Sequence, residues 1–402
     1  MYDGLIEQLV IENTSKIVLL VMDGLGGLQF ENYQGTELEL AKTPNLDALA
    51  QAGSCGLLTP IMTGVTTGSG PGHFGLFGYD PLNTNIGRGV LSAAGLEFDL
   101  TDKDVAARVN FATIDTSGNI TDRRAGRIDT ATNQRVCEIL RQKVKLPKPY
   151  KFFLVTEKEH RALLVLRGPN LAGDLDDTDP QITGVPPLAV KAQNVKSKKA
   201  AALFNDFLKQ ARKALAAEPQ ANMLLLRGFA KHHPYPSLFK RYKLRCLCLA
   251  NYPMYRGVSK LVGMELYPVV KSFAEQVDAL KENFDKYEFF FMHVKATDAT
   301  GEDGDFAAKM KAIEDVDGMI PRITALKPEV LAITGDHSTP SALRAHSWHP
   351  VPLLVWSKNA RYDGSRAFNE KSCQTGGLGR LYSKEMMPLL LAHALRLKKF
   401  GA

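Results

Sequence analysis

Short runs of consecutive apolar residues mark the strands that the sequence predicts. The strongest runs are residues 16–23, 223–228, 288–295, 329–336 and 351–357. Because both faces of these runs are apolar, they are typical of strands covered by helices on each side of a parallel sheet. Apolar residues at helical spacing occur at 43–53, 273–287 and 306–326. This alternation predicts an α/β core with a mostly parallel sheet between helices.

The middle of the chain follows a different pattern. Residues 108–124 and 152–168 are each typical of a hairpin, and the first turns at Ser117-Gly118-Asn119. Residues 195–217 have the spacing of an amphipathic helix with a basic, solvated face. We therefore predict that residues 101–255 form a smaller α+β lid domain that binds the substrate. Residues 1–100 and 256–402 would form the core into which it is inserted.

Composition is that of a globular chain and argues against several classes of partner. The 402 residues are 45% apolar and 23% charged, and no apolar run approaches the roughly 20 residues that span a bilayer. We therefore expect no membrane partner. The net charge of +7 comes from scattered basic residues, which favours a small anionic substrate over nucleic acid. Nothing in the sequence indicates an oligomeric state.

Cysteine usage and the N-terminus indicate a cytoplasmic protein. Five cysteines, an odd number, argue against a disulfide scaffold. Cys246 and Cys248 have no second pair nearby, so we interpret them as alternate residues of a strand and not as metal ligands. The acidic N-terminus lacks the basic start of a secretory signal.

Acidic residues and histidines gather where the predicted core strands end. They are Asp23 at the end of 16–23, Asp298 and Glu302 after 288–295, Asp336 at the end of 329–336 with His337 after it, and His346 and His349 before 351–357. Each alone is also consistent with a turn. Ligands bind at the carboxyl ends of strands in open parallel sheets, so these side chains are expected to meet at one edge. Carboxylates and imidazoles are the ligand set for two divalent metal ions about 4 Å apart, which suit phosphoryl transfer.

A glycine-rich stretch supplies candidate nucleophiles. Thr66, Thr67 and Ser69 lie within it, and glycines on both sides of Ser69 allow the backbone to approach a metal or a phosphate. The following Gly-Pro-Gly-His resembles the start of a helix, whose free N–H groups favour an anion. A simple glycine-rich turn is the alternative interpretation.

The motifs occur in the order expected for the alkaline-phosphatase superfamily: VMDG, TGSGPGH, KATD with GEDGDF, TGDHSTP and HSWHPVP. With FGYDP, GRGVLSAAG, DRRAGR, EHRALLVLRG and DLDDTDP, the chain closely resembles the cofactor-independent phosphoglycerate mutases of the archaeal type. The resemblance runs from about residue 16 to the C-terminus. It implies an alkaline-phosphatase-like core and interconversion of 2-phosphoglycerate and 3-phosphoglycerate through a phosphoserine intermediate, without 2,3-bisphosphoglycerate.

The resemblance also implies roles for individual residues. Ser69 would become phosphorylated. The ligands of one metal would be Asp23, Ser69, Asp336 and His337, and those of the second Asp298, Glu302 and His346. Most relatives have histidine where this chain has Glu302, and the extra oxygen ligand favours Mn²⁺ or Mg²⁺ over Zn²⁺ or Co²⁺.

Basic residues are the candidates for holding a phosphoglycerate and assisting its leaving group. Lys260 is a candidate for protonating the leaving oxygen. The candidates for binding substrate are Arg123, Arg124, Arg127, His160, Arg161 and Arg227. Asp177 and Asp179 would order the lid or bind glycerate hydroxyls. His73 would either pack within its helix or support the metal ligands without binding the metal. His349 is interpreted as structural or as supporting the ligands.

Other functions remain open at this level. The core metal site alone also suits a phosphomonoesterase, a sulfatase-like hydrolase or phosphopentomutase. A non-catalytic relative that binds a phosphorylated metabolite is a further alternative. The arginine-bearing insert favours the glycerate mutase among these.

Overall fold

The computed structural model describes residues 3–30, 32–83, 86–231 and 233–401, and it divides into two compact units. The first unit combines Met1–Asn85 with Tyr235–Ala402, and the second comprises Ile86–Pro234. These borders precede the predicted ones, because α5 (Arg88–Gly95) packs on strands of the second unit and β8 (Cys246–Cys248) belongs to the sheet of the first.

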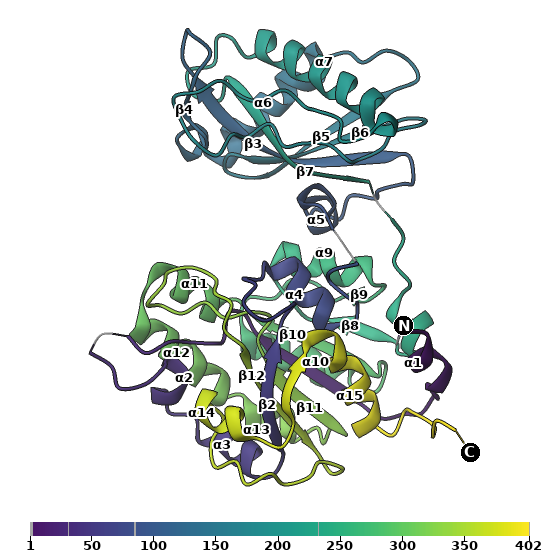
Figure 1. Ribbon diagram of the computed structural model, residues 1–402, viewed down its shortest axis with the longest axis vertical. Coiled ribbons are helices and arrows are strands. Elements are labelled where there is room, and N and C mark those ends of the chain that lie inside the picture. The colour runs from purple at the N-terminus through teal and green to yellow at the C-terminus, as the bar shows by residue number, and fades with distance from the viewer. Residues whose placement is uncertain (1–2, 31, 84–85, 232, 402) are drawn as a thin grey trace. The chain divides into compact units, whose positions relative to one another are not determined.

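An eight-stranded sheet forms the centre of the first unit (Figure 1). Its strands, in spatial order, are β13 (Gly379–Tyr382), β2 (Ser54–Thr59), β12 (Val351–Ser357), β11 (Val330–Thr334), β1 (Ile17–Met22), β10 (Phe289–Val294), β8 and β9 (Glu265–Leu266). β1 lies between β11 and β10 and is parallel to both. The register pairs Met22 with Val294 and Val21 with Thr334, so these three strands end at the same edge.

The prediction of an α/β core with a mostly parallel sheet is confirmed, but two of the predicted strands are antiparallel. β12 is antiparallel to β11 and to β2, because an apolar run carries no information about strand direction. The run at 223–228 belongs to β7 (Met223–Lys231), which lies in the second unit and pairs antiparallel with β3 (Asp104–Ile114).

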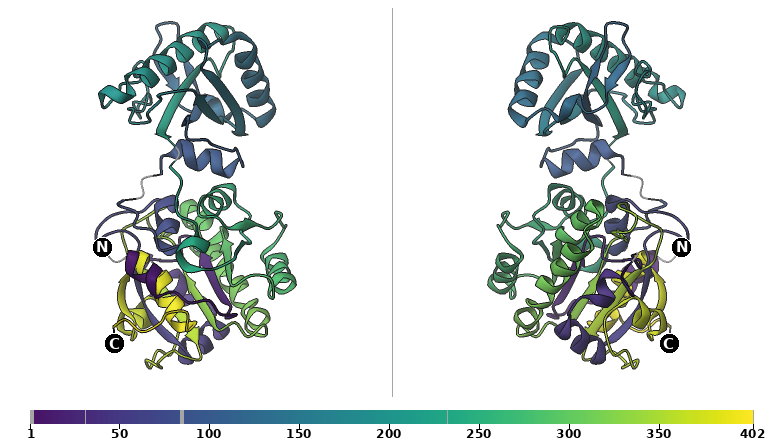
Figure 2. Two further views of the ribbon diagram at one scale, coloured as in Figure 1. Left: turned by 90° about the vertical axis from the view of Figure 1, so that its right-hand side faces the viewer. Right: turned by 90° about the vertical axis from the view of Figure 1, so that its left-hand side faces the viewer.

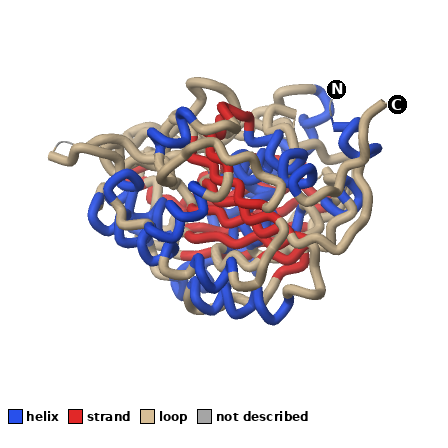
Figure 3. The backbone as a smooth tube through the Cα atoms, turned by 90° about the horizontal axis from the view of Figure 1, so that it is seen from below, coloured by secondary structure: helices blue, strands red, loops and turns tan. Residues whose placement is uncertain are grey.

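Helices cover both faces of the eight-stranded sheet (Figure 3). One face packs against α2 (Glu37–Leu40), α3 (Pro44–Gln51), α10 (Phe273–Asn283), α12 (Phe306–Asp317), α13 (Ile320–Thr324) and α14 (Glu370–Thr375). On the other face, Phe77 beside α4 (Ser69–Leu76) contacts Phe291 of β10. That side also carries α9 (Pro253–Leu261) and α15 (Met386–His393), which contact α4. The remaining helices of this unit are α1 (Asp3–Leu9), α8 (Leu238–Tyr242), α11 (Ala296–Asp303) and η3 (Ser383–Glu385).

Local sequence explains where the helices near the common end of β1, β10 and β11 start and stop. Ser272 and Asp305 cap α10 and α12 by accepting hydrogen bonds from backbone N–H groups of the first turn. Between α11 and α12, Gly304 has a φ of +75°, which glycine adopts without the steric cost other residues meet. These signals fix the length of α11, the helix that carries Asp298 and Glu302.

The second unit is built on an antiparallel five-stranded sheet (Figure 2). β3 pairs with β6 (Arg161–Arg167) on one side and with β7 on the other, and the remaining strands are β4 (Ile120–Asp122) and β5 (Lys151–Lys158). α6 (Thr130–Lys143) and α7 (Lys198–Ala214) pack on one face, while α5 packs on the other. Short 3₁₀ turns lie at η1 (Ala125–Arg127) and η2 (Val195–Ser197). Both predicted hairpins, β3–β4 and β5–β6, are confirmed.

The structure also bears on the expectations drawn from composition. All five cysteines are free and buried, and Cys246 and Cys248 lie on β8 as predicted. Among the helices that the structure describes, none combines the length and apolar character needed to cross a membrane. The basic face of α7 includes Lys209, Arg212 and Lys213, beside its buried apolar stripe.

Phe290 in β10 should contribute strongly to the stability of the first unit. Its side chain is fully buried and its ring stacks on Phe284, 5.6 Å between centroids. We expect Phe290→Ala to lower the free energy of unfolding by about 3–5 kcal/mol, because it removes apolar contacts and leaves a cavity. Urea denaturation would measure it, with Phe239→Ala as the control since Phe239 is 57% exposed. Equal losses in the two variants would contradict this account.

Candidate metal centre

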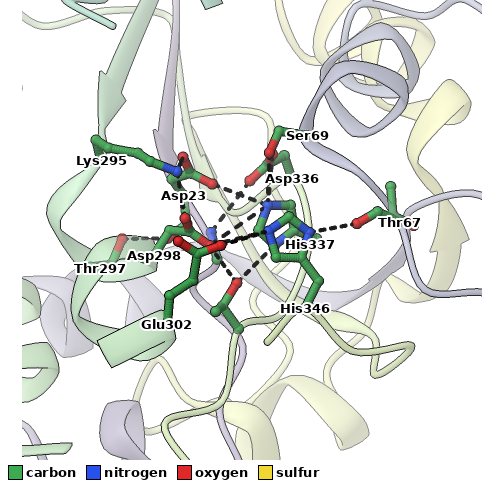
Figure 4. A network of polar contacts seen from close by, with 12 residues as sticks. Asp23, Thr67, Ser69, Lys295, Thr297, Asp298, Glu302, Asp336, His337 and His346 are labelled. Atoms are coloured by element: carbon green, nitrogen blue, oxygen red, sulfur yellow. Dashed lines mark hydrogen bonds and ion pairs between the residues drawn. The ribbon is translucent and has the colours of Figure 1, made fainter. Parts of the chain in front are cut away.

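Three neighbouring strands deliver acidic residues and a histidine to one edge of the first unit's sheet. Asp23 directly follows β1, Asp336 and His337 follow β11, and Asp298 lies in the first turn of α11 after β10. Figure 4 shows these side chains converging, with Ser69 at the start of α4 beside them. The predicted meeting of these strand ends is therefore observed, because the three strands are parallel neighbours in register.

The first cluster consists of Asp23, Asp336 and His337. His337 Nε2 lies 3.2 Å from Asp23 Oδ1 and 3.3 Å from Asp336 Oδ2. The same nitrogen is 3.2 Å from Ser69 Oγ. All four residues are buried. A metal held by these acids and this imidazole would therefore lie beside the serine hydroxyl.

The second cluster consists of Asp298, His337 and His346. Asp298 Oδ1 lies 3.6 Å from His346 Nε2 and 3.9 Å from His337 Nε2. Glu302 is at its rim, with Oε1 3.8 Å from His346 Nε2 and a side chain that is 54% exposed. The two imidazoles stack with ring centroids 3.7 Å apart. The clusters share His337, so the pair has the composition of a binuclear metal site.

Buried oxygens that lack a hydrogen bond fit bound cations. Asp23 Oδ1 and Asp336 Oδ2 are buried and have no hydrogen-bond donor among the described residues. Buried carboxylate oxygens rarely remain unsatisfied, so a positive partner is expected there. His346 donates its Nδ1–H to the Thr67 carbonyl oxygen at 2.8 Å, which leaves Nε2 as the ligand atom.

Two side chains hold the ligands from behind. Thr339 Oγ1 lies 2.6 Å from Asp298 Oδ1 and 3.0 Å from His337 Nδ1, so it connects one ligand to the residue shared by both clusters. His73 Nδ1 lies 2.8 Å from the Ser69 carbonyl oxygen and 3.2 Å from Asp336 Oδ2. His73 therefore supports a ligand and also packs within α4, which joins the two roles considered for it.

A fully buried lysine fixes the loops that carry the ligands. Lys309 of α12 donates to the carbonyl oxygens of Gly24, Gly26 and Thr339 at 2.8–3.2 Å, and its Nζ lies 3.8 Å from Glu37 Oε1. Gly24 has a φ of +63°, and a Cβ there would lie 2.8 Å from Asp298 Oδ1. This close packing explains why a glycine must follow Asp23.

Lys295 and Tyr255 contact Asp23 directly, and neither had a role assigned from the sequence. Lys295 Nζ lies 3.0 Å from Asp23 Oδ2 and contacts Asp298 Oδ2. Tyr255 of α9 donates its hydroxyl to Asp23 Oδ2 and lies 3.3 Å from Lys295 Nζ. The spacing of Lys295 three residues before Asp298 was a usable signal, whereas Tyr255 reaches the site only through the fold.

The charges at the site shift its pKa values in opposite directions. Burial opposes protonation of His337, but Asp336 and Asp23 outweigh it and raise the pKa of His337 to about 9. Burial would raise the pKa of Asp23, yet His293 and His337 hold it well below its ordinary value. Burial would lower the pKa of Lys295, but Asp23 and Asp298 raise it above its ordinary value. In the metal-free protein, positive side chains therefore face the carboxylates.

Lys260 and His349 lie apart from the hydrogen bonds described above. Lys260 is exposed in the last turn of α9, the helix that carries Tyr255. His349 Nδ1 lies 3.0 Å from Ser347 Oγ, and its carbonyl oxygen accepts from Ser338 Oγ. His349 is not a member of either cluster. The cation in contact with ligands of the clusters is Lys295.

Some of the substrate-binding candidates meet around one carboxylate of the second unit. Arg123 donates two hydrogen bonds to Asp179, Nε to Oδ1 at 2.8 Å and a terminal nitrogen to Oδ2 at 2.9 Å. Arg227 NH1 lies 3.6 Å from Asp179 Oδ2, and its buried Nε has no hydrogen-bond partner among the described residues. Asp177 Oδ1 accepts from the Gly228 N–H at 2.6 Å. The two acids therefore order the arginines and the backbone around them.

The other candidates differ in exposure. Arg124 and Arg127 are exposed, and Arg161 is half-buried at the start of β6. His160 is buried, and burial followed by the charges of Arg161 and Arg124 lowers its pKa to about 4. His160 is therefore neutral near pH 7. Burial lowers the pKa of Arg227, and the charge of nearby Arg88 in α5 lowers it further. Arg88 was not among the candidates.

Comparison with known proteins gives one consistent result. A family model described as 2,3-bisphosphoglycerate-independent phosphoglycerate mutase matches residues 50–221. A probable 2,3-bisphosphoglycerate-independent phosphoglycerate mutase of Thermus thermophilus is 50% identical over 400 residues, or 99% of this chain and 98% of the relative. A protein of the same description from Aquifex aeolicus is 45% identical over 405 residues, or 99% of each chain.

Solved structures extend the likeness to three dimensions. A protein from Pyrococcus horikoshii has a TM-score of 0.81 at 29% identity, covering 97% of this chain and all of that one. A cofactor-independent phosphoglycerate mutase from Thermoplasma acidophilum has a TM-score of 0.72 at 28% identity, covering 94% of this chain and all of that one. The likeness therefore extends through both units.

Metal binding should release a proton from His337. Because its pKa is raised to about 9 in the metal-free site, the imidazole is protonated near neutral pH and must become neutral to bind a metal. We expect affinity for Mn²⁺ to fall by about tenfold for each pH unit below 9, with about one proton released. Calorimetry in two buffers of different ionisation enthalpy would count the protons.

The variant His349→Gln is the matched control, since His349 lies in the same segment as His346 but outside both clusters. It should release the same number of protons as the unmodified protein. An affinity that does not change between pH 6 and 9 would contradict the account of His337.

Proposed function

Since the chain belongs to the family of 2,3-bisphosphoglycerate-independent phosphoglycerate mutases, which interconvert 2-phosphoglycerate and 3-phosphoglycerate, we propose that Ser69 carries the phosphoryl group in this reaction. The observation that carries the proposal is the position of Ser69 Oγ, 3.2 Å from the imidazole nitrogen that both metal clusters share. Family membership favours the mutase over the phosphatase, other phosphomutase and binding-protein alternatives.

The phosphoryl group moves in two balanced steps. Ser69 Oγ attacks phosphorus and gives up its proton, the bond from phosphorus to the glycerate oxygen breaks, and that oxygen takes up a proton to become a hydroxyl. Glycerate stays bound and reorients, and its other hydroxyl oxygen gives up its proton and attacks the phosphoryl group, while Ser69 Oγ leaves phosphorus and regains a proton. Water must be excluded between these steps, since its attack on phosphoserine would release inorganic phosphate.

Two divalent ions bound here would supply positive charge that eases loss of the Ser69 proton and offsets charge on the phosphoryl oxygens. Asp23, Ser69, Asp336 and His337 would hold one ion, and Asp298, Glu302 and His346 the other. Asp298 and His346 are held by Thr339 and by the Thr67 carbonyl, which supports their role as ligands. Glu302 contributes oxygen where most relatives have imidazole, which favours Mn²⁺ or Mg²⁺ over Zn²⁺ or Co²⁺.

The arginines of the second unit are proposed to bind the carboxylate and phosphate of the substrate. Arg123 and Arg227 are held by Asp179, so their orientation costs little entropy when an anion arrives. Arg124, Arg127 and Arg161 add positive charge, and His160 would donate or accept a hydrogen bond as a neutral ring. Lys260 remains a proposal for protonating the leaving oxygen. We place the enzyme in the cytoplasm, in keeping with its substrate.

Ser69→Ala should abolish the mutase reaction, because the nucleophile is lost. We expect activity to fall by at least about 1,000-fold. The assay supplies 3-phosphoglycerate, excess enolase and Mn²⁺ without 2,3-bisphosphoglycerate and follows phosphoenolpyruvate absorbance. The unmodified enzyme treated with a chelator should also show no activity. Thr66→Ala should stay active, since Thr66 is exposed. If the unmodified enzyme steadily released inorganic phosphate and formed no phosphoenolpyruvate, the mutase proposal would be overturned.

Glu302→His should shift metal preference toward Zn²⁺, because imidazole suits Zn²⁺ better than carboxylate does. We expect the ratio of the Kd values for Mn²⁺ and Zn²⁺ to change by at least about tenfold. Asp303→His is the matched control, since it places the same change on the exposed neighbouring residue of α11. Unchanged selectivity in Glu302→His would remove Glu302 from the ligand set.

A further inference from the structure

One cation lies between the two metal clusters without belonging to either. Lys295 is the last residue before α11, and its Nζ contacts Asp23 Oδ2 and Asp298 Oδ2. Asp23 belongs to one cluster and Asp298 to the other. Figure 4 shows the Lys295 side chain reaching both carboxylates. A single ammonium therefore joins one ligand of each cluster.

The carboxylates use different oxygens toward the lysine and toward the imidazoles of His337 and His346, while His293 lies on the lysine side of Asp23, 3.4 Å from Oδ2. Asp23 Oδ1 is 3.2 Å from His337 Nε2, and Asp298 Oδ1 is 3.6 Å from His346 Nε2. Lys295 contacts the Oδ2 atom of each. Metal ions could therefore approach the Oδ1 atoms, of which that of Asp298 also accepts a hydrogen bond from Thr339 Oγ1, while the ammonium remains on the Oδ2 side.

Charge balance indicates what this ammonium does. The four carboxylates of the proposed ligand set are balanced by two divalent ions. Loss of the Ser69 proton then adds a further negative charge, and the phosphoryl oxygens of the substrate add more. Lys295 supplies a positive charge that contacts both clusters and is present before substrate arrives. Its side chain is 30% exposed, so it lies at the open side of carboxylates that are themselves buried.

We propose that Lys295 is a charge-compensating residue, which acts through Asp23 and Asp298 to stabilise the negative charge that develops at Ser69 during phosphoryl transfer. This inference rests on the proposed function of the metal centre and of Ser69. An ammonium and a divalent ion repel each other, so Lys295 would not help the metal ions to bind. Removal of the lysine should therefore spare metal binding and impair the chemistry.

Lys295→Met tests the proposal with two independent measurements. Calorimetric titration with Mn²⁺ should give an affinity equal to or higher than that of the unmodified enzyme. In the coupled assay, kcat should fall by about 100- to 1,000-fold with little change in KM, the loss typical of removing one charge-stabilising group. An affinity for Mn²⁺ that is tenfold weaker, a change in KM alone, or full activity would each overturn the proposal.

Chemical rescue separates charge from folding. Lys295→Cys alkylated with 2-bromoethylamine regains an ammonium on a side chain of nearly the same length, and most of the lost kcat should return. All five native cysteines are buried, so the unmodified enzyme given the same treatment is a direct control. No recovery in a fully alkylated, folded sample would contradict compensation by charge.

Two further variants distinguish failure of this inference from failure of the proposed function. Lys311→Met removes an exposed lysine that pairs with Asp315, and it should leave affinity and kcat unchanged. Asp298→Asn removes a proposed ligand and should weaken Mn²⁺ binding. Unaltered Mn²⁺ binding in Asp298→Asn would overturn the metal centre itself, whatever Lys295→Met shows.

Discussion

Concentrated negative charge at the edge of a buried sheet is the constraint on which the rest of the structure depends. Asp23, Asp298 and Asp336 are almost fully buried, and burying an unpaired carboxylate is costly. The protein offsets this cost with cations from two directions. Lys295 contacts the acids directly, while Lys309 holds the backbone behind them. The raised pKa of His337 is a consequence of the same concentration of charge.

Strand order converts this local chemistry into a site. β1 lies between β10 and β11, and all three run parallel and end together, so residues far apart in the sequence arrive within hydrogen-bonding distance. β12 runs the other way, which means that the segment preceding it, and not its end, brings His346 to the same edge. An antiparallel strand therefore completes a site that three parallel strands begin, and Thr339 links the contributions of two of the parallel strands, Asp298 and His337.

Sequence patterns predicted which acidic side chains meet at this edge of the sheet, because strand ends and acidic residues are both local features. Asp23, Asp298 and the Asp336-His337 pair follow directly from apolar runs that stop at one edge. The direction of a strand and the identity of its neighbours are not determined by local sequence. The antiparallel course of β12 was missed for this reason. The run at 223–228 has the pattern of a parallel core strand, yet it lies within the predicted insert and forms β7 of the antiparallel sheet, where α5 and α7 both contact it. The contact of Tyr255 with Asp23 could not be predicted for the same reason.

Burial separates the fixed part of the metal centre from the part free to vary. Asp298 is fully buried and held by Lys295 and Thr339, so a change there would break several contacts at once. Glu302 lies one helical turn further along α11 with more than half of its side chain exposed, and it approaches only His346 among the ligands. Exchange of imidazole for carboxylate at this position disturbs no buried network. A change at this rim position would therefore leave the contacts of the buried Asp298 with Lys295 and Thr339 in place.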